Sequence, residues 1–441
     1  MGWLISSIIA CSIMMALMYI PLSGVTHTVM PHIMMVIATM TVLGPGILFF
    51  ACAYESIKNR IVNMCVLISL GILAAYVYGN LAAQGIFAIP DHAFFMTSVM
   101  LVTFSHIGEY MDERVRKRAD LALRNSMKLK TDRSPVLTEE KEYMDHGHFR
   151  MLIDKISHIS VLIAIGLSFV TFVCWYFFFY HLAGEHPFLW ALKMSIAVLV
   201  IACPCSLCWV TPAATLVASR KGLKHSIIVK HSAAFEKIAR LHVIIFDIHG
   251  LKQEEQDAIV HLKRMNMKVV VIAEDREQMT KFAEQSGRGA DEYYNRISSN
   301  EKKEIIERFQ RQGMRVGVVN NSGSDVSLLT QSDAGIILGT GMNIPKRYGD
   351  IILVKNDLLD MVKAVQLGRR TVSKIKQNVF WAFLFNALGI PIATGALYPV
   401  FGMSLKSEYV ELAMIFSSVL VVINSLSLRF PLFLKVDHSR E

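Results

Sequence analysis

Four short connections between long apolar runs contain almost no lysine or arginine. They are 22–27, 85–91, 182–187 and 399–406, and the last has Lys406 alone. Basic residues collect instead in three other segments, which are 52–61, 112–157 and 219–373. Because positively charged loops stay on the cytoplasmic side of a membrane, we expect these three segments and both chain termini to be cytoplasmic.

The chain also lacks a separate basic soluble domain, which a nucleic-acid-binding protein would require. Its net charge is +9, but the basic residues lie beside apolar runs. That pattern is typical of membrane topology and of attraction to anionic lipid. We therefore expect a lipid bilayer as a partner and no nucleic acid.

The first apolar run has no basic segment before it and no small-residue cleavage site, so we expect it to be retained and not removed as a signal peptide. No cysteine lies outside the apolar runs or their ends. The seven cysteines are Cys11, Cys52, Cys65, Cys174, Cys203, Cys205 and Cys208. This placement argues against an extracellular disulfide framework.

Apolar residues are abundant, at 53% of the chain, against about 45–50% in soluble proteins. Eight runs are long enough to cross a bilayer, which takes about 17–25 residues. They lie near 2–21, 28–51, 62–84, 92–111, 158–181, 188–218, 374–398 and 407–428. The pattern predicts an α-helical polytopic membrane protein with about eight transmembrane helices.

The segment 219–373 predicts one cytoplasmic α/β domain. Its apolar strands at 242–247, 267–274, 314–321 and 333–338 alternate with helices at about 252–265, 276–285 and 300–313. Such alternation is typical of a parallel, doubly wound sheet, in which ligands bind at the carboxyl ends of the strands.

Five regions follow from these assignments. They are transmembrane helices one to four at 1–111, a short charged cytoplasmic linker at 112–157, helices five and six at 158–218, the α/β domain at 219–373, and helices seven and eight with a cytoplasmic tail at 374–441.

The segment IACPCSLCWVTP at 201–212 places a proline inside an apolar run. Proline interrupts helical hydrogen bonding, and such breaks occur at membrane depth where the backbone lines a cavity or is buried in protein. Cys203 and Cys205 flank Pro204, so an unwound backbone can bring together two thiolates that an intact helix would keep apart. Soft thiolates select Cu(I), although the spacing alone also fits two ordinary apolar cysteines around a kink.

Cys-Pro-Cys followed by TP at 211–212, and then by a soluble domain that opens with VIIFD at 243–247, resembles the heavy-metal, copper-type P-type ATPase family. The similarity covers nearly all of the apolar runs and the α/β domain, and it implies that this domain is haloacid-dehalogenase-like (Rossmann-like). The similarity also implies that the two cysteines hold the transported ion inside the membrane.

Two further apolar segments resemble the family's last two core helices. WAFLFNALGIPIA at 381–393 implies a metal ligand at Asn386, and LAMIFSSVLVVINSL at 412–426 implies ligands at Met414 and Ser418. Methionine, asparagine and two cysteines together imply Cu(I) and not zinc, while Ag(I) shares the same preference for soft ligands. The chain departs from the family in having Phe385 where a tyrosine is usual.

The family's cytoplasmic uptake site falls on Met64, Asp112 and Asp154. These residues stand in NMCVLISLGILAAYVYG (63–79), GEYMDERVRKRA (108–119) and LIDKIS (152–157), which resemble the first three core helices. A thioether and two carboxylates imply a weak, exchangeable site that receives an ion from a donor. LGPG at 43–46 lies where the family kinks a helix, and Pro45 with Gly46 predicts the same kink here.

The motifs that drive the family with ATP are altered. The phosphorylated aspartate of DKTGT falls on Asp247, but the motif is DIHGL at 247–251, and TGD is replaced by AED at 273–275. The Mg²⁺ loop GDGIND is replaced by NNSGSD at 320–325, which keeps Asp325 alone, while the family's basic residue is kept as Lys302. Because several groups that stabilise phosphoryl charge are lost, Mg²⁺ and ATP are not expected as cofactors.

Two domains of the family have no room in this chain. Few residues separate DIHGL from the next strand, where the family inserts its nucleotide-binding domain, and 112–157 contains no TGE and only the edges of an actuator domain. We therefore predict a pseudo-ATPase, a truncated and degenerate member that binds Cu(I) in the membrane and transfers or transports it without ATP hydrolysis, in a bacterial-type inner membrane.

Two alternatives remain open from the sequence. The chain could be a regulatory or scaffold subunit that partners an intact copper ATPase or a metalloprotein assembly complex. It could also be a residual ATP-driven transporter, in which case Asp247, Lys302 and Asp325 would be catalytic. The first hypothesis requires a copper donor or acceptor protein as partner.

Overall fold

The computed structural model describes most of the chain. The described residues are 2–19, 29–59, 64–84, 93–127, 148–182, 187–202, 207–247, 255–273, 289–321, 326–339, 349–355, 357–396, 398 and 407–429. They fall into two compact units, each made of several chain segments. One unit comprises Met1–Asp112, Arg150–Thr211 and Gln377–Asn424, and the other comprises Glu113–Phe149, Pro212–Lys376 and Ser425–Glu441.

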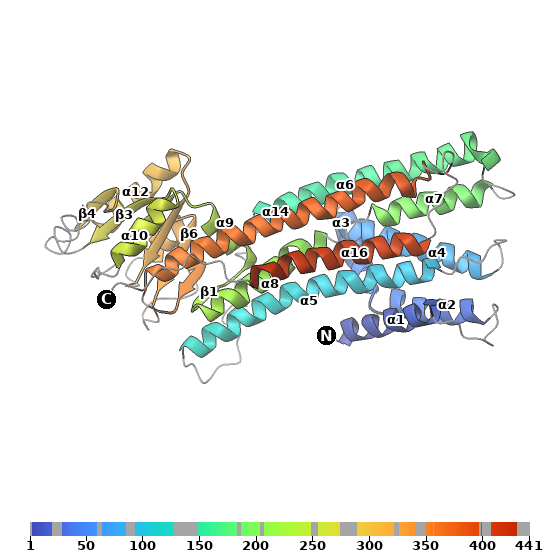
Figure 1. The fold of residues 1–441 in the computed structure, drawn as a ribbon, viewed down its shortest axis with the longest axis horizontal. Coiled ribbons are helices and arrows are strands. Elements are labelled where there is room, and N and C mark those ends of the chain that lie inside the picture. Colours follow the sequence, from blue (N-terminus) through green and yellow to red (C-terminus); the bar gives the residue numbers. More distant parts are fainter. Residues whose placement is uncertain are drawn as a thin grey trace. The chain divides into compact units, whose positions relative to one another are not determined.

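The first unit is helical (Figure 1). Its helices are α1 (Gly2–Tyr19), α2 (Met30–Leu43), α3 (Ile47–Lys58), α4 (Met64–Ala83), most of α5 (Ala93–Met127), most of α6 (His148–Val173), the π-helical turn Cys174–Phe178, the 3-10 turn Tyr180–Leu182, α7 (Pro187–Ile201), the start of α8 (Leu207–Lys224), the second half of α14 (Leu359–Ala393), and α16 (Ser407–Leu426).

The prediction of eight spans is wrong by the measure of helix length and apolarity. Among the described residues, Cys65–Ala83 and Ile159–Phe178 are long and apolar enough to cross a membrane, and the bent pair α2 and α3 would make a third. Gly2–Leu17, Pro187–Ile201 and Phe416–Leu426 are apolar but shorter. Two of the other expected spans contain buried polar side chains, which are His106 in α5 and Asn378 in α14.

The kink predicted at LGPG is confirmed. Helix α2 ends at Leu43 and α3 begins at Ile47, and the two are bent by 49°. Pro45 cannot donate a backbone hydrogen bond. At Gly46 a β-carbon would lie 2.4 Å from the Val42 carbonyl oxygen, so only glycine fits the turn.

Helices α3 and α4 pack side by side, and a disulfide joins Cys52 to Cys65 with a Cα–Cα distance of 5.9 Å. The sequence did not predict this bond, because the cysteine placement argued only against an extracellular framework. An apolar cluster that includes Phe49, Ile68 and Leu101 places α3, α4 and α5 around one core.

The second unit contains a seven-stranded sheet in the order β1-β7-β6-β5-β2-β3-β4. The strands are β1 (Ile227–Val229), β2 (Val243–Asp247), β3 (Lys268–Ala273), β4 (Glu292–Asn295), β5 (Val316–Asn320), β6 (Ala334–Leu338) and β7 (Ile351–Leu353). The helices between them are α9 (Ser232–Ala239), α10 (Glu255–Arg264), α12 (Ser299–Arg311) and α13 (Val326–Gln331), and the 3-10 turn Ser427–Arg429 also belongs to this unit.

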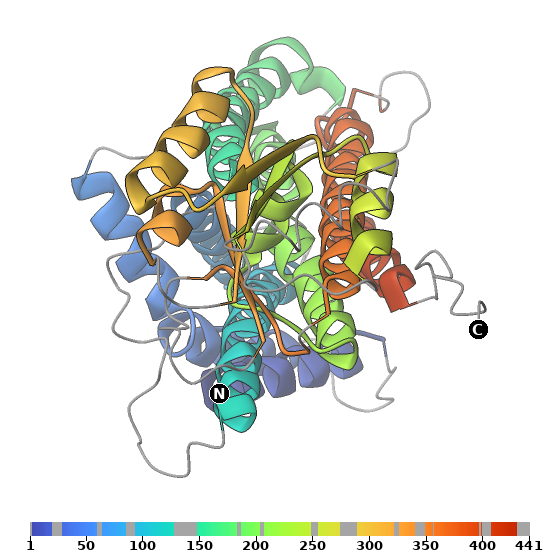
Figure 2. The same cartoon turned by 90° about the vertical axis from the view of Figure 1, so that its left-hand side faces the viewer.

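The predicted parallel sheet is confirmed for six strands, and only β1 runs antiparallel to its neighbour β7. The four predicted strands correspond to β2, β3, β5 and β6, whereas β1, β4 and β7 were missed. Figure 2 shows the sheet nearly edge-on, with α10 and α12 on opposite faces. The helix expected at 276–285 lies outside the described residues.

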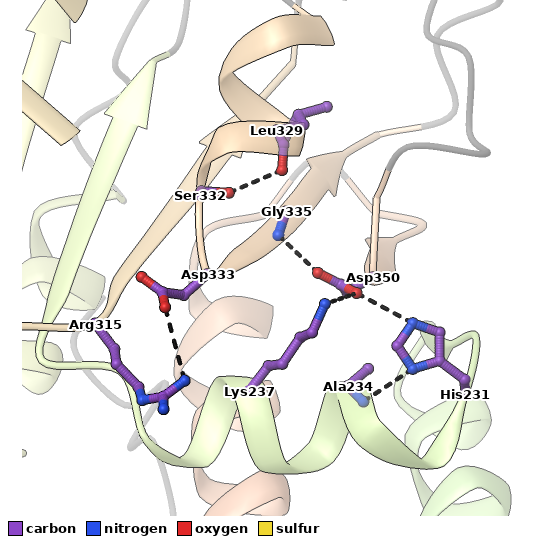
Figure 3. A network of polar contacts seen from close by, with 9 residues as sticks. All are labelled: His231, Ala234, Lys237, Arg315, Leu329, Ser332, Asp333, Gly335 and Asp350. Carbon is purple, nitrogen blue, oxygen red and sulfur yellow. Dashed lines mark hydrogen bonds and ion pairs between the residues drawn. The ribbon is translucent and has the colours of Figure 1, made fainter. Parts of the chain in front are cut away.

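A polar network fastens α9 to the strands β6 and β7 (Figure 3). Asp350 accepts hydrogen bonds from Lys237 at 3.0 Å and from the Gly335 backbone at 3.0 Å, and His231 Nε2 lies 3.1 Å from the same carboxylate. The other ring nitrogen of His231 accepts from the Ala234 backbone and caps α9. Burial alone would raise the pKa of Asp350, but His231 and Lys237 outweigh burial and lower it to about 2.

Candidate functional site

The strongest described site is at the carboxyl ends of the central strands. Asp247 is the last residue of β2 and Asn320 is the last residue of β5, and the parallel register pairs these two residues directly. Both are buried, with Asn320 fully enclosed. Strands that end together bring their final side chains to one edge of the sheet, which is where ligands bind in such folds.

Lys302 reaches this edge from the first turn of α12. A capping box formed by Ser298 and Glu301 starts the helix there, since the Ser298 hydroxyl accepts from the Glu301 backbone and the Glu301 carboxylate accepts from the Ser298 backbone. Glycine closes the far end, with Gly313 at φ +75°. The caps therefore fix the helix on which Lys302 stands.

Both oxygens of the Asp247 carboxylate are engaged. Lys302 Nζ donates to Oδ1 at 2.8 Å, and Asn320 Nδ2 donates to Oδ2 at 3.0 Å. The Lys302 and Asp247 side chains are only 13% and 9% exposed, so the pair is largely withdrawn from water. Because a carboxylate only accepts hydrogen bonds, the Asn320 amide must present its nitrogen, and this assignment follows from the chemistry of its partner.

The sequence analysis named Asp247 and Lys302 but missed Asn320. The signal was present, because NNSGSD places Asn320 at the first glycine of the family's GDGIND loop. The next position of the motif, where the family has aspartate, is Asn321 in this chain. A glycine has no side chain, so only the folded structure shows that its replacement reaches the carboxylate of the neighbouring strand.

The described residues around Asp247 do not fit a Mg²⁺ ion. That ion prefers carboxylate and phosphate oxygens in octahedral geometry, whereas Asp247 faces an ammonium group and an amide N–H. Among the residues that the structure describes, no group of three or more His, Cys, Asp or Glu side chains is placed to hold a metal. Ala273, at the end of β3, supplies no hydroxyl at this edge.

Several predicted residues cannot be placed. Cys203, Cys205 and Asp325 lie outside the described residues, and so do the side chains of Met64, Asp112, Asp154 and Met414.

Asn386 and Ser418 can be placed on their helices. Asn386 is partly buried in α14, and Ser418 is buried in α16 at 3% exposure. Their neighbours Phe385 and Phe416 form an edge-to-face ring pair at 5.6 Å. The two helices therefore meet at the level of the predicted ligands.

A buried amide pair braces the helices that follow the Cys-Pro-Cys segment. Asn424 of α16 donates to the Asn378 side-chain oxygen at 2.8 Å, and Asn378 of α14 donates to the Val210 carbonyl of α8 at 3.3 Å. Asn378 has no exposed surface. Asn378, Ala382 and Asn386 are spaced four residues apart and so share one face of α14.

Comparisons with known proteins point to one family. The Archaeoglobus fulgidus protein named "Probable copper-exporting P-type ATPase" is 22% identical over 90% of this chain and 75% of its own length. "Probable copper-transporting ATPase PacS" of Synechococcus elongatus is 35% identical over 43% of this chain, which is only 25% of its own length. A crystal structure of a zinc-transporting PIB-type ATPase in the E2.Pi state has a TM-score of 0.71 with 13% identity, covering 97% of this chain and 99% of that one. No protein-family model matches the chain.

The chain is therefore similar in sequence to copper-exporting and copper-transporting P-type ATPases, and its fold matches that of PIB-type ATPases. The fold combines a helical unit with an α/β unit. The chain covers about a quarter of the length of several curated relatives. The interval between Asp247 and Lys268 is too short for the family's inserted nucleotide-binding domain.

Proposed function

We propose that this chain binds Cu(I) inside the membrane and passes it on without hydrolysing ATP. Cys203 and Cys205 would be the central thiolate ligands, with Asn386, Met414 and Ser418 completing the site. Support for copper comes from the soft ligand set and from relatives named as copper-exporting and copper-transporting ATPases.

The observation that carries the proposal is the doubly engaged carboxylate of Asp247. Phosphoryl transfer needs this carboxylate as a nucleophile, with a metal ion and cationic groups around the phosphate. Here Asn320 and Lys302 hold its two oxygens, and the chain has Ile248 and Ala273 in place of a lysine and a threonine. Each lost contact of this type costs about 3–4 kcal/mol, or about 10²–10³ in rate.

The α/β unit then has a structural role. Its strands and helices are complete around Asp247, with a continuous apolar core on the α12 face that includes Ile245, Val318 and Phe309. Helix α14 continues from this unit into the membrane unit. We propose that the unit is retained as a folded cap between membrane helices.

The remaining steps of copper uptake and delivery are proposed from the resemblance to the family. Met64, Asp112 and Asp154 would receive Cu(I) from a donor protein at the cytoplasmic face of a bacterial-type plasma membrane. A copper acceptor or assembly complex would take the ion onward. In the predicted topology both termini are cytoplasmic. The basic segments 52–61, 112–157 and 219–373 would then lie on the same side of the membrane as the donor protein.

One observation favours a residual ATP-driven transporter as the second candidate. Asp247 and Lys302 keep the family's residues and stand 2.8 Å apart. A phosphorylated intermediate would require Asn320 to move off the carboxylate, and the Asp247→Asn variant would then lose function. Under the leading proposal the same variant keeps copper binding unchanged.

The test uses the full chain purified in detergent and reduced under anaerobic conditions. Bound Cu(I) and ATP turnover are measured for the wild type, for Cys203→Ser with Cys205→Ser, and for Asp247→Asn. Cys174→Ser is the matched control, since it removes a free cysteine elsewhere in the membrane unit.

We expect the Cys203 and Cys205 variant to lose about one Cu(I) per chain, the other two variants to bind as the wild type does, and none to turn over ATP. Unchanged copper binding in the Cys203 and Cys205 variant would overturn the metal assignment and leave a scaffold. Vanadate-sensitive ATP turnover that disappears in Asp247→Asn would establish the second candidate.

A further inference from the structure

Two cysteines outside the Cys-Pro-Cys segment bring their sulfur atoms together. Cys52 lies in the second half of α3, and Cys65 is the second residue of α4. Their Cα atoms are 5.9 Å apart and the sulfurs are bonded. Both side chains are partly exposed, so small molecules and ions can reach the pair.

The pair stands at the basic end of the α3–α4 hairpin. Lys58 ends α3 and Arg60 follows in the connection, so the positive-inside rule assigns this end to the cytoplasm. Disulfides are rare there, because low-molecular-weight thiols keep cysteines reduced. Reduction of Cys52–Cys65 by such a thiol consumes two electrons and two protons and leaves two neighbouring thiol groups.

Buried polar groups without partners lie about one helical turn away. His106 of α5 is only 6% exposed and makes an edge-to-face contact with Phe49, at 4.9 Å between ring centroids. Phe49 precedes Cys52 by three residues on α3. His106 Nδ1 lies 2.9 Å from the Val102 carbonyl and so must donate to it, which leaves the lone pair on Nε2.

Nε2 of His106 has no partner within the described part of the chain, and the same holds for the hydroxyl of Ser69, four residues after Cys65. A buried imidazole with an unused lone pair is the tautomer that binds metals. Buried polar groups almost always have partners, so these two atoms are available to a further ligand at this junction of α3, α4 and α5.

We propose that reduced Cys52 and Cys65 form a second Cu(I) site, at the cytoplasmic end of the α3–α4 hairpin. The ion is held as a two-coordinate bis-thiolate. On binding, two thiols release two protons to solvent, two copper–sulfur bonds form, and no electron is transferred. Only the identity of the ion rests on the function proposed above.

The number of ligands at Cys52 and Cys65 favours one class of metal ion. Structural zinc sites take four ligands, but the described residues contain no group of three or more His, Cys, Asp or Glu side chains placed around a metal. Two thiolates satisfy a soft monovalent ion such as Cu(I) or Ag(I). Cys65 directly follows Met64 in the chain, so the new site would stand beside the proposed uptake site.

The experiment isolates this site in a Cys203→Ser, Cys205→Ser background. The full chain is reduced, and Cu(I) bound per chain is measured by anaerobic competition with a chromophoric Cu(I) chelator. Cys52→Ser with Cys65→Ser is compared with Cys11→Ser with Cys174→Ser, which removes two described cysteines that form no disulfide. X-ray absorption then counts the sulfur atoms around the copper.

We expect the background to keep about one Cu(I) with two sulfur neighbours, the Cys11 and Cys174 variant to match it, and the Cys52 and Cys65 variant to lose it. Oxidation with diamide should abolish this binding, and a dithiol should restore it. An unchanged copper count in the Cys52 and Cys65 variant would overturn the proposal.

The two proposals fail separately. If the second site is absent while Cys203→Ser with Cys205→Ser still lowers copper binding in the otherwise unmodified chain, the membrane site stands alone. If only the Cys52 and Cys65 variant lowers binding, the second site stands and the membrane site does not.

Discussion

Asn320 gives the Asp247 carboxylate a hydrogen-bond partner that a glycine could not supply. Asn320 stands where the family's Mg²⁺ loop begins with glycine, and its amide donates to the Asp247 carboxylate at 3.0 Å. With Lys302 on the other oxygen, the carboxylate has the hydrogen bonds that a buried charge requires. Both oxygens of this buried carboxylate are therefore paired within the α/β unit.

The local stability that the Asp350 side chain provides should depend on pH. Its pKa is lowered to about 2 by His231 and Lys237 against the effect of burial, whereas an unfolded aspartate has a pKa of about 3.9. A lowered folded pKa adds stability above the unfolded value, and that stability is lost as the pH falls toward 2. Asp350→Asn should therefore weaken the strands β6 and β7 by about 2 kcal/mol at neutral pH.

Amide hydrogen exchange over 334–353, measured on the full chain and corrected for intrinsic rates, reports this local stability. The difference between Asp350→Asn and the wild type should shrink between pH 4 and pH 2. Asp257→Asn is the control, because Asp257 is an exposed carboxyl of the same unit and should change nothing. A deficit that is constant across this pH range would contradict the assigned role of the ionised carboxylate.

Among the elements, the break between α2 and α3 depends on close backbone contact. The Gly46 N–H donates to the Thr41 carbonyl at 2.9 Å, and a side chain at Gly46 would meet the Val42 carbonyl. This break sets the direction of α3 and so brings Cys52 alongside Cys65 of α4. The local sequence at Gly46 therefore helps to set the pairing of Cys52, six residues later in the chain, with Cys65 of α4.

Gly46→Ala should lower the thermal unfolding midpoint of the detergent-solubilised chain. The added methyl group would lie 2.4 Å from the Val42 oxygen, and relieving that contact by opening the turn costs about 1–3 kcal/mol. Gly166→Ala is the matched control, because a β-carbon there meets nothing within 4 Å and alanine favours a helix. Equal midpoints for the two variants would show that the turn tolerates a side chain.

The elements that the sequence missed are the shortest ones. Strands β1 and β7 have three residues each and β4 has four. Three apolar residues show no period that separates a strand from a helix. These strands exist because each one pairs with a neighbour, as Val229 of β1 pairs with Ile351 of β7.

At the scale of the whole molecule, the distribution of basic residues predicts the topology. The segment 85–91 has no lysine or arginine, whereas 112–157 has many. With native cysteines replaced by serine, Ala88→Cys should react with a membrane-impermeant maleimide in intact cells. Ser134→Cys should react only after the cells are permeabilised, because the positive-inside rule places it in the cytoplasm.

Labelling of permeabilised cells controls for the accessibility of both positions. Labelling of Ser134→Cys in intact cells would reverse the assigned orientation, and the proposed cytoplasmic faces of the uptake and Cys52–Cys65 sites would then be extracytoplasmic.

From the sequence alone we predicted the resemblance to heavy-metal P-type ATPases, the central strands, the kink at Pro45 and the altered motifs at 247–251, 273–275 and 320–325. These properties depend on residue types at close spacing, such as Cys-Pro-Cys or a buried strand that ends in aspartate, and a chain carries that information locally. The predicted number of spans was wrong, because among the described residues only two helices, or three with the bent pair, are both long and apolar enough to cross a membrane.

The contacts between side chains that are distant in sequence became known from the tertiary structure and could not be predicted from local patterns. Asn320 and Asp247 are separated by 73 positions, and their contact follows from strand register. Cys52 and Cys65 come from different helices, and His106 of a third helix contacts Phe49 of α3. Hydrogen bonding and thiolate chemistry act over a few ångströms, so these functions depend on packing that no local pattern encodes.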